Sequence, residues 1–257
     1  MNLRLTLLLC CLATTSQGRA GDPNPIDRLD RVACIESQVP SQPNTGKLCS
    51  AFVVNADSRL YLVTAGHASA ETNADSRLRY RDAKGESQWI TLKSLIPPSS
   101  NPWHRDPTSD FAVAEFHPRE GNAAYISQLT ALSFPLESLC TETPHRTTAI
   151  VTTGFPLMIG TRDGISPIAV AGHIASRDIL TDNSWGREPI VFCIPALAQG
   201  TSGGPTLLLS DPQNSIVVVG MYIGVVHDSS GAKLSKMVPA HLIRKCITGL
   251  IADSDGG

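Results

Sequence analysis

A serine enclosed by glycines is the clearest sign of chemistry in this 257-residue sequence. Ser202 lies in the segment QGTSGGP, residues 199–205. Glycines permit a tight turn that exposes a hydroxyl and lets another molecule approach the backbone closely. Such a turn can also direct successive backbone N–H groups at one point, where they can hold a negatively charged oxygen. The same residue types are common in ordinary polar turns, so this segment alone leaves both interpretations open.

A serine hydroxyl is a weak nucleophile at neutral pH and needs a neighbouring base. Of the seven histidines, His67 stands out because it follows the apolar segment 61–65 and a glycine. A strand end with small neighbours would fix an imidazole and leave it accessible. Asp110 begins a second apolar segment, 110–116, and a carboxylate in that position is expected to be partly buried and paired. We therefore expect Asp110 to orient the His67 ring.

The elements that must position these residues are predicted to be short β-strands. Apolar, β-branched segments recur along the chain, and clusters of Gly, Pro, Asn and Asp separate them. This pattern favours an all-β sandwich or barrel. The predicted strands cover 48–54, 60–65, 77–81, 89–96, 110–116, 148–153, 167–174, 189–194, 205–209 and 216–226. Segment 238–251 instead has apolar residues at steps of three and four, which predicts a helix.

The first 20 residues have the pattern of a secretion signal. Arg4 precedes an apolar core over residues 5–13, and small residues precede Ala20. The core is too short for a spanning helix, which needs about 20 apolar residues. We expect cleavage after Ala20 and a secreted or periplasmic protein without membrane association; a retained N-terminal anchor is the alternative. The net charge of −2, without a basic run, gives no indication of nucleic-acid binding.

Five of the seven cysteines follow the signal segment. An oxidising compartment favours disulfides, although the sequence does not determine which cysteines pair. Our hypotheses are Cys34 with Cys49 and Cys140 with Cys246, which would leave Cys193 free. There is no Cys-x-x-Cys motif and the histidines lack ligand spacing, so we predict no metal site.

Three motifs resemble those of the chymotrypsin/trypsin family of serine proteases. Residues 64–67 (TAGH) resemble its histidine motif, 109–113 (SDFAV) its aspartate motif and 200–205 (GTSGGP) its serine motif. The order His, Asp, Ser is also that of the family. The resemblance extends over roughly residues 45–250, and the segments TGFP and VPA look closest to bacterial exported members.

The resemblance implies two antiparallel six-stranded barrels, a C-terminal helix and an active site between the barrels. It implies a triad of His67, Asp110 and Ser202, an oxyanion hole made by the N–H groups of Gly200 and Ser202, and no organic cofactor. The expected partner is a protein or peptide substrate. We divide the chain into a signal peptide (1–20), an N-terminal barrel (21–125), a linker (126–147), a C-terminal barrel (148–238) and a helix with its tail (239–257).

The resemblance also implies a specificity pocket, to which we assign Ala196, Leu197, Gln199, Ile223, Gly224 and Val225. Ala196 stands where trypsin-like specificity needs a carboxylate, so we expect an uncharged residue before the scissile bond. Lys233 or Leu234 could form the far wall, and a lysine there would instead favour acidic residues. Thr201 replaces the aspartate that pancreatic members pair with a new N-terminus, so we expect no activating cleavage beyond signal removal.

The sequence therefore predicts an exported serine endopeptidase that works through an acyl-enzyme. A catalytically inactive relative that acts as a binding module is one alternative, because a fold does not guarantee a function. An α/β-hydrolase esterase is another, because Gly-x-Ser-x-Gly fits its nucleophile turn. The chain after Ser202 is short for that fold, however, and the alternation of strands and helices is missing.

Overall fold

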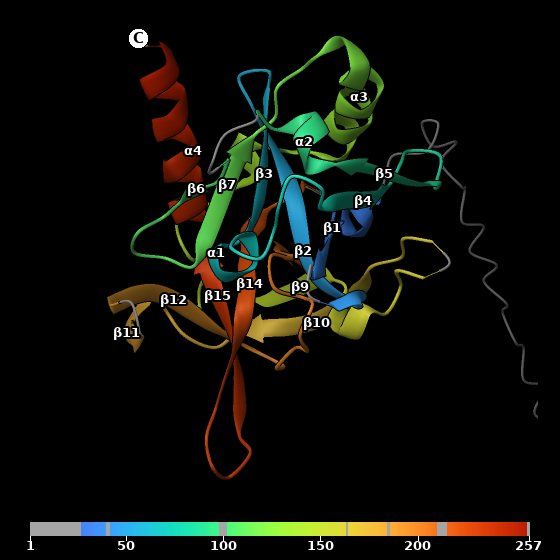
Figure 1. Cartoon of the computed structure of the whole chain (residues 1–257). Helices are drawn as coiled ribbons and strands as arrows, with labels where there is room; N and C mark the ends of the chain where they lie inside the picture. The colour runs from blue at the N-terminus through green and yellow to red at the C-terminus, as the bar shows by residue number, and fades with distance from the viewer. Residues whose placement is uncertain are drawn as a thin grey trace, which may run out of the picture.

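The structure is a computed structural model that describes residues 27–39, 42–97, 102–162, 164–183, 186–209 and 215–255. The predicted signal segment 1–20 lies outside these residues. Figure 1 shows two β-sheets that meet near the centre of the molecule and a C-terminal helix packed beside them. No helix in the described part of the chain is long and apolar enough to cross a membrane.

The first sheet has eight strands in the order β5-β4-β1-β2-β3-β7-β6, with β8 paired to β2. Every pairing in it is antiparallel except that of β2 with β8. β6 and β8 have only two residues each, so six strands form the main body of the sheet. The bounds are β1 (Ala33–Val39), β2 (Gln42–Ala56), β3 (Arg59–Ala65), β4 (Arg77–Arg81), β5 (Ser87–Thr91), β6 (His104–Arg105), β7 (Phe111–Glu115) and β8 (Phe134–Pro135).

The second sheet has seven strands in the order β10-β9-β13-β14-β15-β12-β11. A further pairing between β10 and β12 closes six of these strands into a ring, from which β11 extends as a hairpin with β12. Closure of the ring removes free sheet edges. The bounds are β9 (Ala149–Gly154), β10 (Ile168–Ile174), β11 (Ile179–Asn183), β12 (Gly186–Ile194), β13 (Pro205–Leu208), β14 (Val218–His227) and β15 (Lys233–Pro239).

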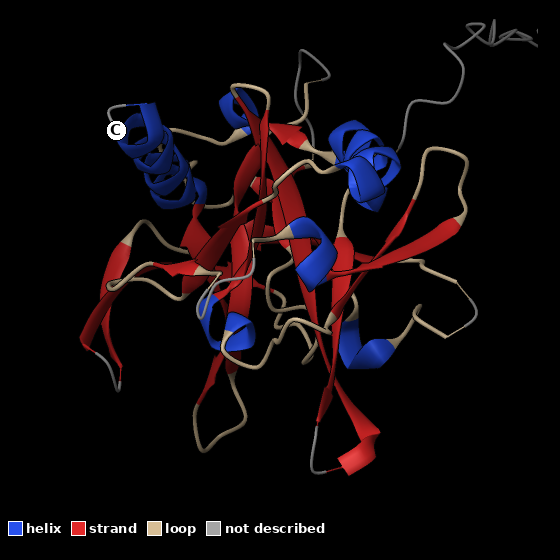
Figure 2. Ribbon diagram, turned by 45° about the horizontal axis from the view of Figure 1, so that its top comes forward, coloured by secondary structure: helices blue, strands red, loops and turns tan. Residues whose placement is uncertain are grey.

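One apolar core connects the two sheets and the last helix. It contains Phe52 and Val63 of the first sheet, Leu207 of the second, and Ile243 and Ile247 of the helix. The helical spacing places these two isoleucines on one face, and Figure 2 shows that helix lying against the strands. The α-helices are α1 (Gly66–Ser69), α2 (Leu92–Leu95), α3 (Ala123–Leu132) and α4 (Ala240–Asp255).

The prediction of an all-β protein with two antiparallel units and a C-terminal helix is confirmed. Strand β1 was not predicted, because residues 32–35 are all buried and show no alternation of polar and apolar side chains. Helix α3 spans the boundary between the predicted N-terminal barrel and the predicted linker, and its Leu129 and Leu132 pack into the core. The division into domains stays a prediction.

The disulfide hypotheses do not agree with the structure, in which all five described cysteines are free thiols. In the register of β1 and β2, Cys34 lies opposite Ser50 and Ile35 lies opposite Cys49. Cys34 and Cys49 therefore point to opposite faces of the sheet and cannot bridge. Cys140 and Cys246 are both partly buried against the core as separate thiols.

Candidate active site

His67 lies immediately after the end of β3, in the short helix α1. Its backbone N–H donates to Asp110 Oδ1 at 2.7 Å, and its ring Nδ1 lies 2.6 Å from Asp110 Oδ2. Gly66 permits this approach, because a Cβ atom there would lie 2.9 Å from Asp110 Oδ1 and 3.1 Å from the backbone nitrogen of Phe111. With an ionised Asp110, Nδ1 must be the donor, which leaves Nε2 of the neutral ring as an acceptor.

Asp110 immediately precedes β7, and only 7 % of its side chain is exposed. Burial alone would raise the pKa of this carboxyl group. The hydrogen bonds from the ring and backbone of His67, together with the positive charge of Lys236, outweigh burial and hold the Asp110 pKa below its ordinary value. Asp110 is therefore an anion at neutral pH, suited to orient an imidazole and to stabilise its protonated form.

Ser202 lies in a loop whose conformation requires glycine. Gly200 and Gly203 have φ angles of +94° and +90°, in the left-handed region that other residues rarely adopt. A Cβ atom on Gly200 would lie 2.4 Å from the Phe155 carbonyl oxygen, and one on Gly203 would lie 1.9 Å from that of Ser50. The glycines therefore let the loop pack directly against neighbouring backbone.

The loop leaves two backbone donors free. Within the described residues, the N–H groups of Gly200 and Ser202 have no hydrogen-bond acceptor. Neighbouring backbone groups of the loop are held by hydrogen bonds. The N–H of Thr201 donates to the Ala198 carbonyl at 3.4 Å, and the Gln199 carbonyl accepts from the N–H of Leu157 at 2.7 Å. Residues 198–201 thus form a turn closed by the bond from Thr201 to Ala198, and the positive φ of its third residue, Gly200, is that of a type II turn. These two N–H groups are thus free to donate to a bound oxygen atom.

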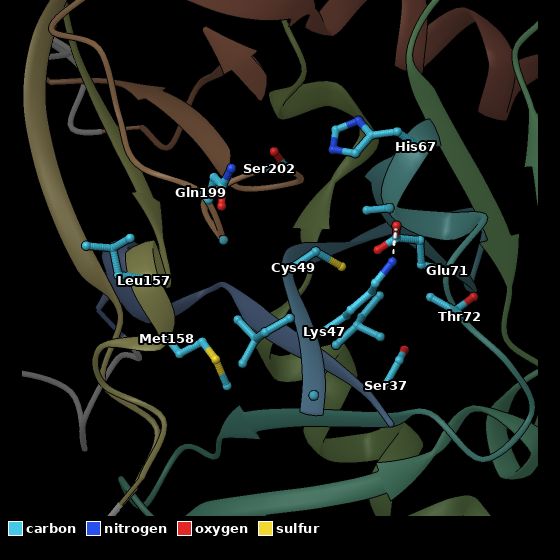
Figure 3. Close-up of a pocket in the computed structure, with 15 residues that line it drawn as sticks. Ser37, Lys47, Cys49, His67, Glu71, Thr72, Leu157, Met158, Gln199 and Ser202 are labelled. Atoms are coloured by element: carbon cyan, nitrogen blue, oxygen red, sulfur yellow. Dashed lines mark hydrogen bonds and ion pairs between the residues drawn. The ribbon is translucent and has the colours of Figure 1, made fainter. Parts of the chain in front are cut away.

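The Ser202 hydroxyl itself is held loosely. Among the described residues its single hydrogen bond runs to the Ile223 carbonyl at 3.4 Å, and none joins it to His67. Figure 3 nevertheless shows the His67 ring facing Ser202 across the top of a hollow. Hydrogen bonds between catalytic groups are often long or absent without substrate and tighten when it binds.

The hollow has a volume of about 590 Å³, and its lining includes the four predicted residues His67, Gln199, Gly200 and Ser202. Apolar side chains of Leu48, Leu157 and Met158 and an ion pair between Lys47 and Glu71, at 2.5 Å, complete much of its wall (Figure 3). Among the described residues, no group of three or more His, Cys, Asp and Glu side chains is arranged to hold a metal ion.

The other predicted pocket residues lie outside this hollow. Ala196 and Leu197 are half-buried in the segment after β12, where the Leu197 carbonyl accepts from the hydroxyl of Tyr222 at 2.8 Å. Ile223, Gly224 and Val225 belong to β14. Lys233 and Leu234 are exposed at the start of β15 and do not line the hollow either.

Two residues that the sequence analysis did not identify hold the site together. The hydroxyl of Ser50, on β2, donates to the Gly200 carbonyl at 2.8 Å and accepts from Phe155 N–H at 3.1 Å. Glu188, on β12, accepts from the backbone N–H of Asp110 at 3.2 Å. Ser50 is a polar residue among buried neighbours, which is a local signal, whereas Glu188 lies in a strand of mixed burial and offers none.

The family follows from a sequence comparison. The profile of the family described as trypsin-like peptidase domain matches residues 49–221, which include His67, Asp110 and Ser202. The chain belongs to the trypsin-like peptidase family. This is a family of hydrolases that act on peptides, so the resemblance drawn from the three motifs is confirmed at that level. No curated protein matches the sequence significantly.

Solved bacterial serine proteases share the trypsin-like fold of this chain. The MamO protease domain from Magnetospirillum magneticum has 14% identity and a TM-score of 0.54, covering 86% of this chain and 95% of that one. The active form of the Rv3671c protease from M. tuberculosis has 18% identity and a TM-score of 0.53, covering 83% and 77%. The HtrA-type protease AlgW with tripeptide has 16% identity and a TM-score of 0.54, covering 90% and 64%. At these identities the similarity concerns the fold alone.

Proposed function

We propose that this chain is an exported serine endopeptidase with Ser202 as nucleophile, His67 as general base and acid, and Asp110 as the orienting carboxylate. One observation carries the proposal. Asp110 binds both the backbone N–H and the ring Nδ1 of His67, and this ring lines the same hollow as Ser202. Membership of a peptidase family supports the class of reaction.

The chemistry would proceed by acyl transfer. The Ser202 oxygen attacks the carbonyl carbon of a peptide bond while Nε2 of His67 takes the hydroxyl proton. The carbonyl oxygen becomes an oxyanion and accepts hydrogen bonds from the N–H groups of Gly200 and Ser202. The imidazolium then gives its proton to the leaving amine, which produces an acyl-enzyme. Water attacks this ester by the same route and releases Ser202.

The residue preference is also part of the proposal. Neither Ala196 nor Leu197 carries a charge, so we propose that the residue before the scissile bond is uncharged. The side chains of Leu48, Leu157 and Met158 make part of the neighbouring hollow apolar. A peptide library should show preferred cleavage after uncharged residues. A strong preference for Arg or Lys before the cleaved bond would contradict this assignment.

A second function has one observation in its favour. The Ser202 hydroxyl bonds to the Ile223 carbonyl rather than to His67, which is compatible with a catalytically inactive relative that only binds peptides. The hollow beside Ser202 and the free donors on Gly200 and Ser202 would then serve recognition alone. The two functions differ in whether Ser202 becomes covalently modified.

Covalent labelling with a fluorophosphonate distinguishes them. This reagent phosphonylates an activated serine, and we expect one label on the wild type at Ser202. Ser202→Ala should abolish labelling, whereas Ser230→Ala, which removes an exposed hydroxyl near the β14–β15 turn, should leave it unchanged. A wild type that remains unlabelled at pH 8 would support the binding module and contradict the endopeptidase.

A further inference from the structure

A buried carboxylate of the second sheet touches the backbone of Asp110. Glu188 lies on β12, and none of its side chain is exposed. Its Oε1 atom accepts from the Asp110 N–H at 3.2 Å, and its Oε2 atom lies 3.5 Å from Nζ of Lys236 on β15. The backbone of Asp110, just before β7, is therefore linked directly to an ion pair of the second sheet.

The burial of Glu188 is compatible with folding because its charge is compensated. A carboxylate removed from water is unfavourable unless an opposite charge and hydrogen bonds replace its hydration. Lys236 supplies the charge, and 19 % of its own side chain remains exposed. β12 and β15 pair directly, with Phe192 opposite Lys236, so one rigid sheet carries both members of the pair.

The contact from Glu188 completes a set of bonds around Asp110. The Asp110 carbonyl accepts from Gly66 N–H at 3.0 Å, its N–H donates to Glu188, and its carboxylate binds His67. Both backbone polar groups are thus engaged, one by Gly66 of α1 and the other by Glu188 of the second sheet. Because the backbone is held on both sides, the carboxylate has little freedom to turn away from the imidazole.

The pair also contributes to the charge around Asp110. Asp110 and Glu188 bring two negative charges to this region, and Lys236 neutralises one of them. Lys236 is among the groups that lower the pKa of Asp110, against the larger opposing effect of burial. Across the hollow, Lys47 and Glu71 neutralise each other. The nearby thiol of Cys49 stays uncharged, because burial raises its pKa to about 12.

We propose that Glu188 and Lys236 form a positioning pair, which fixes Asp110 from the second sheet and keeps the electrostatic field at His67 balanced. This proposal rests on the proposed function, since it assigns the pair to the same site. Neither residue touches the reacting atoms, and both act through Asp110.

The pair predicts shifts of opposite sign in the titration of His67. Glu188→Gln keeps an acceptor for the Asp110 N–H but leaves the positive charge of Lys236 uncompensated. This charge disfavours the His67 imidazolium, so the midpoint of its titration falls. Lys236→Met removes the positive charge of the pair, so the His67 imidazolium is favoured and the midpoint of its titration rises. We expect each shift to be about 0.5 to 1 pH unit. The double variant Glu188→Gln/Lys236→Met should titrate within about 0.3 unit of the wild type, since the two charge changes cancel.

The experiment is an NMR titration of the His67 ring in the full chain, performed with the wild type and the three variants. The control is Arg187→Gln, which changes one charge at an exposed position next to Glu188 on β12 and should leave the midpoint unchanged. Thermal unfolding checks that each variant is folded. If a single variant does not fold, the double variant and the other single variant still test the cancellation.

Kinetics provide a second measurement. For the two single variants we expect kcat to fall about tenfold with little change in KM, because substrate contacts are intact and only the orientation of His67 is disturbed. The double variant should recover part of this loss. Shifts of the same sign in both single variants, or no shift in either, would overturn the proposal. Fluorophosphonate labelling of the wild type tests the proposed function separately, because the titration does not depend on catalysis.

Discussion

The two sheets hold the proposed catalytic residues in different ways. On the first sheet, two short side-chain hydrogen bonds join Asp110 to the backbone and ring of His67. On the second sheet, Ser202 is positioned by backbone conformation, through glycines at φ angles of +94° and +90°, while its hydroxyl makes one contact of 3.4 Å. His67 and Asp110 are therefore held by side-chain hydrogen bonds, whereas Ser202 is held by the backbone conformation of its loop.

This difference matches the chemistry required of each half. The imidazole must keep one tautomer and accept a proton, so a buried anion beside Nδ1 is useful before substrate arrives. The serine must move toward a carbonyl carbon, and its surroundings must present N–H groups to the oxygen that becomes negative. Substitutions on the two sheets should therefore affect different measurements.

The largest effect is expected on the first sheet. Asp110→Asn preserves the shape of the side chain but offers the ring a neutral amide, which allows the wrong tautomer. We expect kcat to fall about 10⁴-fold with the fold retained. Asp106→Asn is the control, since Asp106 accepts only from Thr108 among the described residues, and it should change kcat less than twofold. A loss below tenfold in Asp110→Asn would show that this carboxylate does not orient the base.

Gly200→Ala should disrupt the backbone conformation of the loop that carries Ser202. The added Cβ would meet the Phe155 carbonyl oxygen at 2.4 Å, so the turn must shift and its N–H leave the oxyanion position. We expect kcat to fall about 10²- to 10³-fold, while the His67 titration stays unchanged. Gly249→Ala on α4, where a Cβ meets nothing within 4 Å, is the matched control. Equal losses in both variants would mean that the Gly200 effect is not local.

Ser50→Ala tests how the first sheet supports the serine loop. The substitution removes the hydrogen bonds to the Gly200 carbonyl and from Phe155 N–H. We expect kcat to fall about tenfold, which corresponds to about 1.4 kcal/mol, with KM nearly unchanged. Ser133→Ala, at another buried hydroxyl that donates to the Thr130 carbonyl, should lose similar stability and no activity. A normal kcat in Ser50→Ala would show that the glycines alone fix the loop.

Local patterns in the sequence were sufficient to predict the elements that carry the proposed triad. The strand predicted over 60–65 corresponds to β3, and the helix predicted over 238–251 from its apolar spacing corresponds to α4. These features depend on residues close together in the chain, so periodicity and turn chemistry reveal them.

The supporting contacts could not be predicted because they join distant segments. Ser50 meets Gly200 across 150 positions, and Glu188 meets Asp110 across 78. Nothing local distinguishes Glu188 from an exposed strand residue, and its role appears only when β12 is placed against the first sheet. Strand β15 was missed for a similar reason, since the alternation in KLSKMVP is weak and its apolar residues pack in the closed ring.

The smallest expected effect concerns the pH dependence of the free energy of unfolding, to which Asp110 contributes and an uncharged residue does not. The Asp110 pKa is lower in the folded protein than its ordinary value, so the folded state binds fewer protons than the unfolded chain. The stabilisation is therefore present above about pH 4 and is lost as the pH falls through the folded pKa. In urea unfolding, Asp110→Asn should be less stable than the wild type at pH 7, and the difference should narrow at pH 3. Ser133→Ala removes no charge and should lose the same free energy of unfolding at both pH values. If the wild type and Asp110→Asn differ in free energy of unfolding by the same amount at pH 7 and pH 3, the contact with His67 does not stabilise the ionised carboxylate.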